Sequence, residues 1–170
     1  GNLQKQWGWQ PEVGEYVQHT EEGFENICKL KFHLVNGKDN EILVVNNPTP
    51  DNINKSTHVL KAQLNETANS LVAKVARFNK KFRYAHLKVL MSSPGIVKFK
   101  IRGDNFIPFE DSQKYTKTGK WQELIFDMDY YAPVENMEIS FETENPQTIY
   151  IDDIISVSYT HLTLPTTSRV

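Results

Sequence analysis

Apolar and polar side chains alternate along most of this chain of 170 residues. The clearest runs are residues 84–91, 97–102 and 137–142, in which every second residue is apolar. Successive side chains of a strand point to opposite faces of a sheet, so a period of two predicts strands with one buried face. No helical period is sustained along the sequence, and the chain is therefore predicted to be all-β.

Turn-forming residues separate these runs. Glycine, proline and asparagine favour tight turns, and they occur at Asn36-Gly37, Asn46-Asn47-Pro48, Ser93-Pro94-Gly95, Thr118-Gly119 and Asn145-Pro146. Short strands at this spacing predict a two-sheet antiparallel β-sandwich. Residues 41–45 are expected to form a strand buried on both faces, and residues 1–23 an irregular segment. Residues 69–81 also fit a helical turn, but a strand fits them better.

Charge and hydropathy exclude two classes of partner. With 19 Lys and Arg against 21 Asp and Glu, the formal net charge is -2, whereas nucleic-acid binding relies on clustered cations. We therefore expect no nucleic-acid partner. No apolar run approaches the roughly 20 residues that cross a bilayer, so no membrane insertion is expected. The sequence begins at Gly1 without a secretory signal, and its N-terminus is interpreted as trimmed or truncated.

Two residues with reactive or bulky side chains are expected to serve packing. Cys28 is the single cysteine, which excludes an intramolecular disulfide and a Cys-based metal site. Because it alternates with Leu30 and Phe32, we expect a small buried core residue. Trp121 follows the turn at Gly119 and is expected to pack in the core or at a sheet edge.

The last residues carry a different signal. Residues 157–166 resemble the in-frame translation of a transposase-type sequencing adaptor, and strand periodicity stops near Ile155. Segments of such origin are excluded from fold reasoning. We therefore expect one domain over residues 1–156 and a non-native tail over residues 157–170.

Several segments together resemble a known group of modules. They are Val44-Val45-Asn46-Asn47-Pro48, residues 52–60, Tyr84-Ala85-His86-Leu87-Lys88-Val89, Val97-Lys98-Phe99-Lys100-Ile101, residues 118–127 and residues 149–154. Their order is similar to that of galactose-binding-like β-jelly-roll modules of Bacteroidetes, which resemble carbohydrate-binding modules of glycoside hydrolases or surface glycan-binding proteins. The likeness covers residues 41–155 and implies a jelly-roll fold, although one fold hosts many functions.

The resemblance also implies a structural calcium ion. In these modules an N-terminal acid, backbone carbonyls and the first Asp after a core strand hold the ion, and calcium prefers oxygen ligands of this kind. Asp152 matches that Asp, and Glu25 of Gly23-Phe24-Glu25 is the nearest match to the acid. The alternative is that Asp152 and Asp153 are solvated or capping carboxylates at a strand end.

Sugar recognition combines aromatic faces with fixed polar groups. Rings on loops can face solvent, and outward strand faces supply charges, among them Lys98, Lys100, Glu138 and Glu142. The candidate ligand-binding residues are His86, Lys88, Arg102, Asp104, Phe106, Phe109, Tyr115, Tyr130 and Tyr131. A polar binding face requires these strands to be neighbours. The alternative is that the rings serve packing and the charges form a solvated sheet face.

Catalytic motifs are not apparent in the sequence. Residues 137–142 are the nearest approach to the Glu-x-Asp-x-x-Glu of laminarinase-like hydrolases, and they lack its central Asp. There is no phosphate-binding loop, serine elbow or zinc-type histidine spacing. We therefore expect a protein that is not an enzyme.

The leading expectation is a non-catalytic carbohydrate-binding module. It would be extracellular or at the cell surface, part of a larger multidomain glycan-processing protein, and would hold that protein near a polysaccharide. The alternative is a structural or protein-interaction jelly roll of a bacterial surface lipoprotein without a glycan site. A small lyase or hydrolase is the third reading. Exposed loop rings would favour the first, buried rings the second, and a cleft with two facing carboxylates the third.

Overall fold

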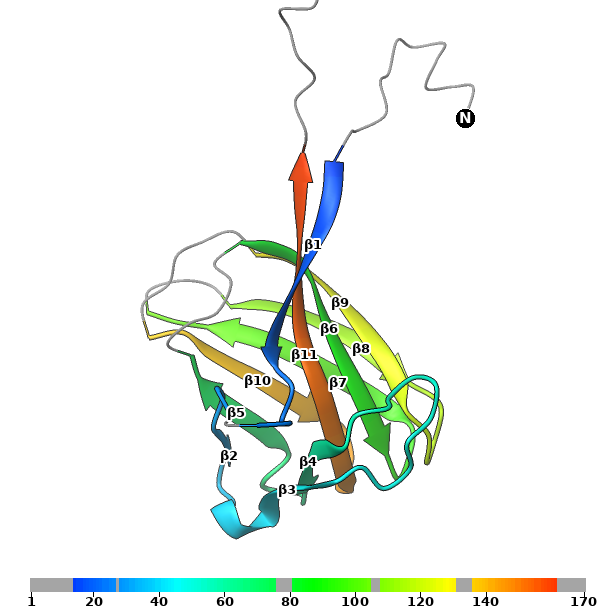
Figure 1. Cartoon of the computed structure of the whole chain (residues 1–170). Helices are drawn as coiled ribbons and strands as arrows, with labels where there is room; N and C mark the ends of the chain where they lie inside the picture. The colour runs from blue at the N-terminus through cyan, green and yellow to red at the C-terminus, as the bar shows by residue number, and fades with distance from the viewer. Residues whose placement is uncertain (1–13, 27, 76–80, 105–107, 131–135, 162–170) are drawn as a thin grey trace, which may run out of the picture.

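The chain folds into two stacked β-sheets (Figure 1). The computed structural model describes residues 14–26, 28–75, 81–104, 108–130 and 136–161. Its elements are β1 (Gly14–Glu22), β2 (Phe32–Leu34), the 3-10 helix η1 (Asp39–Glu41), β3 (Ile42–Asn46), β4 (His58–Gln63), β5 (Ser70–Lys74), β6 (Phe82–Met91), β7 (Gly95–Arg102), β8 (Phe109–Tyr115), β9 (Gln122–Tyr130), β10 (Glu138–Thr143) and β11 (Thr148–His161). Within these residues there is no α-helix, and so none that is long and apolar enough to cross a membrane.

Strand pairing defines the two layers. Sheet A has six strands in the order β3-β4-β11-β6-β9, with β1 also paired to β11, and sheet B has five in the order β2-β5-β10-β7-β8. Every pairing of the described strands is antiparallel. The predicted all-β, two-sheet antiparallel sandwich is confirmed.

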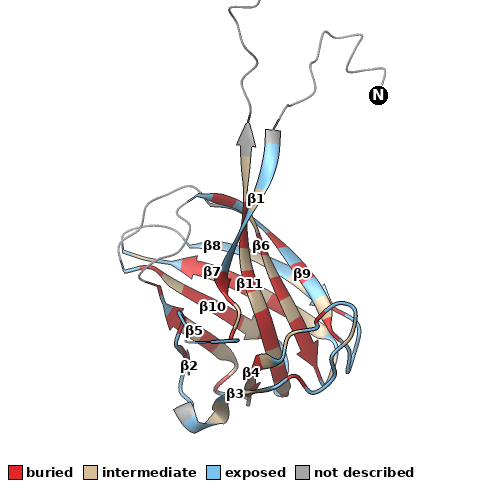
Figure 2. Cartoon of the chain, in the orientation of Figure 1, coloured by how far each residue is buried: buried red, intermediate tan, exposed pale blue. Residues whose placement is uncertain are grey.

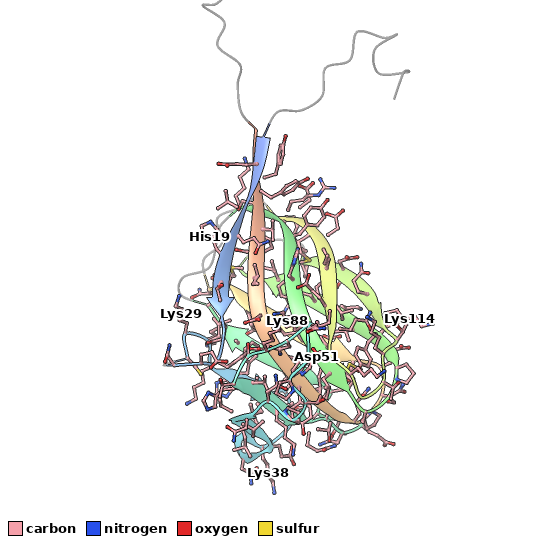
Figure 3. The ribbon with its side chains drawn as sticks, turned by 45° about the vertical axis from the view of Figure 1, so that its right-hand side comes forward. His19, Lys29, Lys38, Asp51, Lys88 and Lys114 are labelled. Carbon is pink, nitrogen blue, oxygen red and sulfur yellow. The ribbon has the colours of Figure 1, made fainter. Side chains whose placement is uncertain are left out.

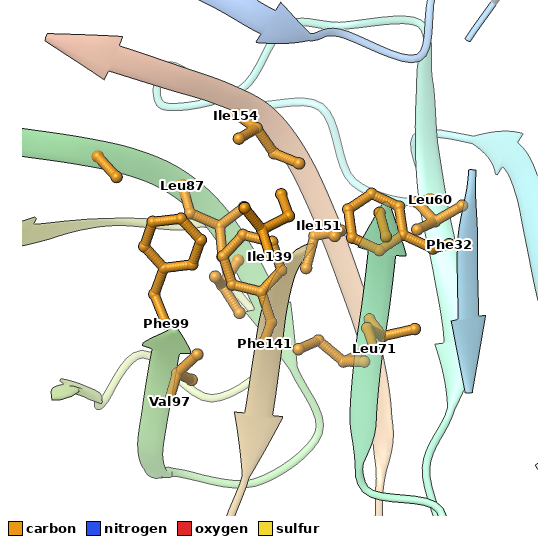
Figure 4. Close-up of a cluster of buried hydrophobic side chains, with 14 of the residues drawn as sticks. Phe32, Leu60, Leu71, Leu87, Val97, Phe99, Ile139, Phe141, Ile151 and Ile154 are labelled. Atoms are coloured by element: carbon orange, nitrogen blue, oxygen red, sulfur yellow. The ribbon is translucent and has the colours of Figure 1, made fainter. Parts of the chain in front are cut away.

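One hydrophobic core lies between the sheets, as the alternation predicted. Buried and partly buried residues alternate along the central strands (Figure 2). The ring of Phe99 in β7 stacks on Phe141 in β10 at 4.9 Å between centroids (Figure 4). It also lies 5.6 Å from the ring of Phe126 in sheet A. Offset and tilted ring pairs of this kind add to the free energy gained from burial alone. The contact between Phe99 and Phe126 joins the two sheets.

Strand β11 occupies the middle of sheet A. Residues 148–151 pair with β4, residues 154–161 pair with β1 on the same side, and β6 runs along the other side. A register shift between Asp152 and Ile155 interrupts the pairing with β6, and Asp153 there has a φ of 48°. Such a bulge redirects the side chains around it.

A second, smaller apolar cluster lies on the outer face of sheet A. Val59, Leu90 and Trp121 are buried there, away from the main core, with Val45 and Tyr150 packed against them. Asn47 accepts a hydrogen bond from Trp121 of this cluster, and its amide nitrogen donates to the carbonyls of Asn54 (3.2 Å) and Ser56 (3.0 Å) in the β3–β4 connection. Trp121 is 1% exposed, which confirms its expected packing role.

Two expectations about strands are wrong. Residues 41–45 are not buried on both faces, because β3 pairs only with β4 among the described strands and lies at a sheet edge. Leu43 and Val44 are therefore 55% and 46% exposed. The segment 1–23 is not irregular throughout, because Gly14–Glu22 forms β1 against β11. The preference for a strand within residues 69–81 is confirmed for Ser70–Lys74.

Strand β11 also continues beyond Ile155, where the periodicity was expected to stop, and ends at His161. The adaptor origin of residues 157–170 stays a prediction, as does the boundary of the domain at residue 156.

The expectation for Cys28 is wrong as well, because its thiol is exposed. The chain bends after β1, with Phe24 at a φ of 57°. Both oxygens of the buried Glu22 carboxylate hold this bend, since they accept the N–H groups of Phe24 (2.9 Å) and Leu30 (2.8 Å). The burial of alternate residues that begins at Leu30 therefore does not extend back to Cys28.

Candidate functional site

The outward side chains of sheet B form one continuous polar surface, called here the sheet B face. Their neighbours along β2, β5, β7 and β10, and Phe109 and Tyr115 at the two ends of β8, pack in the core, so their own direction is outward. They are His33, Ser70, Val72, Lys74, Ile96, Lys98, Lys100, Arg102, Glu110, Ser112, Lys114, Glu138, Ser140 and Glu142. One row crosses all five strands as His33–Val72–Ser140–Lys100–Glu110.

Ion pairs across the strands hold two of the three cations of β7. Lys100 Nζ lies 3.7 Å from Glu110 Oε2 and 3.8 Å from Glu142 Oε1, and Arg102 Nη2 lies 2.5 Å from Glu138 Oε1. The Lys100 side chain is only 22% exposed. Partial burial and two partners favour one side-chain position, whereas fully exposed pairs contribute little order or stability. Lys98 makes no ion pair with any described residue of the chain.

The charged rows of β7 and β10 are neighbours, as a polar binding face requires, but two of the candidate residues lie elsewhere. His86 and Lys88 are in β6, on the outer face of sheet A. His86 Nδ1 lies 3.3 Å from Glu123 Oε1, and Lys88 Nζ lies 2.6 Å from Asp153 Oδ2. The condition for one polar face, that these strands be neighbours, is therefore not met for His86 and Lys88 with Arg102, because β6 and β7 belong to different sheets.

Tyr115 is not a solvent-facing ring. It is completely buried, and its hydroxyl lies 2.7 Å from the Lys117 carbonyl and 2.6 Å from the Lys120 carbonyl. As a binding residue it is therefore a wrong prediction, because its ring closes the β8–β9 turn from inside.

The other loop candidates divide into three groups. Phe109 is in β8, half-buried against the main core, and is not on a loop. Phe106 and Tyr131 lie outside the described residues, and only the backbone of Tyr130 is described. Asp104 is exposed and accepts a hydrogen bond of 2.6 Å from Asn136 Nδ2, which joins the segment after β7 to the one before β10.

Sequence reasoning missed Glu110, Ser112 and Ser140 as members of the sheet B face. Residues 110–114 are all polar, so they carry no apolar alternation that could have shown which of them face outward. An exposed ring was also missed: Tyr16 in β1 is 61% exposed and lies 6.4 Å from Tyr84, but both belong to sheet A.

Asp152 is the most unusual carboxylate of the described chain. It is fully buried, and neither of its oxygens has a hydrogen bond. The side chains of Ser56 and Asn54 face it without reaching ordinary hydrogen-bond geometry, and the Asn54 amide nitrogen is also unpaired. Burial, reinforced by the charge of Asp153, raises the pKa of Asp152 from 3.8 to about 6. A buried carboxylate without partners is costly unless it is protonated or meets a cation.

Glu25 borders the same connection between β3 and β4. Its Oε1 accepts the N–H groups of Thr57 (2.8 Å) and His58 (3.1 Å), and its Oε2 lies 3.4 Å from His58 Nδ1. These backbone hydrogen bonds, the one from His58 foremost, lower the pKa of Glu25. Glu25 is thus an anion, and it fixes the end of the β3–β4 connection, the segment whose Asn54 and Ser56 side chains face the unpaired carboxylate of Asp152.

The residues fit a cation with oxygen ligands, subject to one restriction. Unpaired carboxylate oxygens at Asp152 suit calcium, which binds carboxylate, amide and backbone oxygens. Within the described residues, however, no three His, Cys, Asp or Glu side chains converge. A calcium ion here would need backbone carbonyls and water to complete its shell.

Solved structures with a similar fold are carbohydrate-binding modules. A variant of a family 29 module, complexed with mannohexaose, matches with a TM-score of 0.56 and 10% identity over 86% of this chain and 93% of that one. A family 61 module in complex with β-1,4-galactotriose matches with a TM-score of 0.55 and 13% identity over 84% and 99%. The family 22 and GH10 modules of Clostridium thermocellum endo-1,4-β-D-xylanase 10B, complexed with xylohexaose, match with a TM-score of 0.54 and 15% identity over 84% of this chain and 28% of that one.

No protein-family model and no curated protein matches the sequence. The structural likeness confirms the jelly-roll fold that the resemblance implied. At these identities the likeness concerns the fold, and the function has to be argued from the side chains.

Proposed function

We propose that this chain is a non-catalytic carbohydrate-binding module that holds an oligosaccharide or polysaccharide against the sheet B face. One observation carries the proposal: ordered cations and carboxylates alternate across the open face of a jelly roll, as Glu142 and Glu110 do around Lys100.

This arrangement suits sugar hydroxyls. Each hydroxyl both donates and accepts hydrogen bonds, so neighbouring ammonium and carboxylate groups can satisfy it in both directions. Hydrogen bonds to charged groups are stronger than those between neutral groups. Because Val97, Phe99 and Ile101 anchor β7 in the core, the outward groups between them are held in place before a ligand arrives, which lowers the entropic cost of binding.

The same carboxylates are poorly arranged for glycoside hydrolysis. Glu138 and Glu142 are four residues apart on β10, which is about 13 Å along an extended strand, whereas paired catalytic carboxyls lie about 5–10 Å apart. Each is also within 4 Å of a cation, Arg102 or Lys100. This geometry supports a binding role without catalysis.

A structural calcium ion at Asp152 and Glu25 belongs to the proposal. It is supported by the unpaired buried oxygens of Asp152 and by the common chain segment that both residues border. The ion would neutralise a buried anion and stabilise the fold, and it would not take part in sugar binding at the opposite sheet.

An extracellular or cell-surface location, within a larger chain, is also proposed. Large polysaccharides are found outside cells, and a binding module acts by keeping attached domains close to them. The similar structure that joins a carbohydrate-binding module to a GH10 module supports such an arrangement.

A structural or protein-interaction jelly roll is the second candidate, and one observation favours it. Tyr115 and Trp121 are buried and Phe109 is half-buried, so these rings are not free to stack on a sugar.

Binding to a panel of plant, algal and host polysaccharides separates the two candidates. We expect a ligand to be found by affinity electrophoresis, and Lys100→Ala to weaken its binding about tenfold, the equivalent of one charge-assisted hydrogen bond. Lys38→Ala is the matched control, because Lys38 is exposed in the turn before η1, far from Lys114 at the edge of the sheet B face (Figure 3). Folded protein that binds no polysaccharide would favour the structural candidate.

A further inference from the structure

The charges of the sheet B face are not balanced. The outward positions of its strands carry five cations (Lys74, Lys98, Lys100, Arg102 and Lys114) and three carboxylates (Glu110, Glu138 and Glu142). The whole chain has a formal net charge of -2. Positive charge is therefore concentrated on one face of a slightly acidic protein, and such a field attracts anions to that face.

Lys98 is the cation that remains available at the middle of this face. Its cross-strand neighbours are Glu142 on β10 and Ser112 on β8. Glu142 lies within ion-pair distance of Lys100 instead, at 3.8 Å, and no described group pairs with Lys98. On the other side of Glu142 this row continues to Ser70 on β5. The row therefore reads Ser70–Glu142–Lys98–Ser112, with a serine hydroxyl at each end. An anion at Lys98 would meet an ammonium group and nearby hydroxyl donors.

The described strands of this face offer no Phe, Tyr or Trp side chain. Neutral glycans gain much of their affinity by laying an apolar sugar face on an aromatic ring. On this face the affinity has to come from hydrogen bonds and charge. A fourth carboxylate, Glu144 just after β10, lies at the rim of this face, where it accepts the N–H of Ile96 at 2.5 Å.

We propose that the ligand of the sheet B face is an anionic polysaccharide, whose carboxylate or sulfate groups bind at Lys98 and along β7. The inference rests on the proposed carbohydrate-binding function and narrows its ligand class. Lys98, Lys100 and Arg102 follow one another at about 7 Å on the strand, so one extended chain can contact more than one of them.

The experiment compares polymers that differ only in charge. Polygalacturonate is compared with its fully methyl-esterified form, and carrageenan with desulfated carrageenan, each at low and high salt by isothermal titration calorimetry. We expect at least one charged polymer to bind about tenfold or more tightly than its uncharged counterpart, and salt to weaken that binding. The pair that shows the difference identifies the anion as carboxylate or sulfate.

Three variants locate the interaction, and thermal melting verifies that each is folded. Lys98→Met keeps most of the stem without the charge, and we expect about a tenfold loss for the charged polymer. Lys98→Arg should retain most of the affinity, and Lys38→Met should leave it unchanged.

Three outcomes would overturn the inference. Binding to neutral glycans alone, unaffected by Lys98→Met, would reject the anionic ligand and keep the proposed function. Equal affinity for a DNA duplex would show a face that attracts any polyanion without selecting sugar. Binding to no polysaccharide at all would reject the proposed function and this inference together.

Discussion

Trp121 donates its indole N–H to the amide oxygen of Asn47 across 3.0 Å, and both residues are buried. The same amide oxygen accepts the backbone N–H of Thr49 at 3.1 Å. This contact fastens the β3–β4 connection onto the outer face of sheet A, where the apolar surface of Val59 and Leu90 would otherwise be open to water.

Replacing Trp121 separates packing from hydrogen bonding. Trp121→Ala should lower the free energy of unfolding by about 3–5 kcal/mol, as truncation of a buried aromatic does. Trp121→Phe keeps much of the apolar contact and loses the N–H, so a loss of about 1–3 kcal/mol is expected. Urea denaturation measures both. Equal losses in the two variants would show that the hydrogen bond outweighs the packing.

The buried carboxylate of Asp152 predicts an unusual pH dependence of the free energy of unfolding when a chelator keeps the protein free of metal. Its pKa is raised from 3.8 to about 6, so the folded protein keeps this proton to a higher pH than the unfolded chain does. The contribution of Asp152 to stability is therefore greatest below about pH 4 and falls until about pH 6. Relative to wild type, Asp152→Asn should be more stable near pH 7 by up to about 3 kcal/mol. A difference between the two proteins that does not vary with pH would contradict the raised pKa.

Calcium should make the wild type more stable than Asp152→Asn near pH 7, the opposite of the order expected in chelator. An ion bound to ionised Asp152 stabilises only the folded state, by about 2.7 kcal/mol when its concentration is a hundredfold above the dissociation constant. The melting temperature of the wild type should therefore rise with calcium near pH 7, and that of Asp152→Asn should not. Magnesium is the matched control, because its smaller octahedral shell fits backbone-rich sites poorly. A wild-type protein indifferent to calcium would remove the ion from the proposal.

The Tyr115 hydroxyl should matter for stability and not for binding. It is within hydrogen-bond distance of three carbonyls, those of Met91, Lys117 and Lys120, and can donate to one of them at a time. Tyr115→Phe should cost about 1–2 kcal/mol in the free energy of unfolding and leave polysaccharide affinity unchanged. Loss of affinity with unchanged stability would restore Tyr115 to the binding site.

Cys28 offers a test of the bend after β1. The thiol is exposed, so a maleimide reagent should modify the native protein without denaturant, which a core cysteine would resist. Partial burial, and secondly the charge of Glu22, raise the thiol pKa. The reaction should therefore be slower than that of free cysteine at the same pH, and mass spectrometry follows both. A native protein that is not modified would place Cys28 in the core.

Alternation in the sequence was enough to assign the inner faces of the central strands. Val97, Phe99 and Ile101 are all buried, as their spacing predicted. Alternation reports which side of a strand is buried, but it does not report which strands are neighbours. For this reason His86 and Arg102 could both be proposed as ligand-binding residues, although they belong to different sheets.

Edges and bends were the least predictable features. The apolar run of β3 reads like a central strand, and only the absence of a second partner among the described strands leaves Val44 exposed. Tyr115 looked like a loop residue because polar residues surround it in the sequence. Its ring can be buried because turn carbonyls accept a hydrogen bond from its hydroxyl. A local sequence pattern shows neither which strands pair nor which hydrogen-bond partners a buried side chain will find.

The position of β11 has a consequence for biosynthesis. A nascent chain that has emerged as far as β9 possesses β4 and β6 but lacks the strand that separates and joins them. Sheet A cannot close on the ribosome until residues 148–157 are free, and contacts between distant parts of a sequence form slowly. The incomplete domain must therefore avoid aggregation during most of its translation, while the central strand of sheet A has not yet been synthesised.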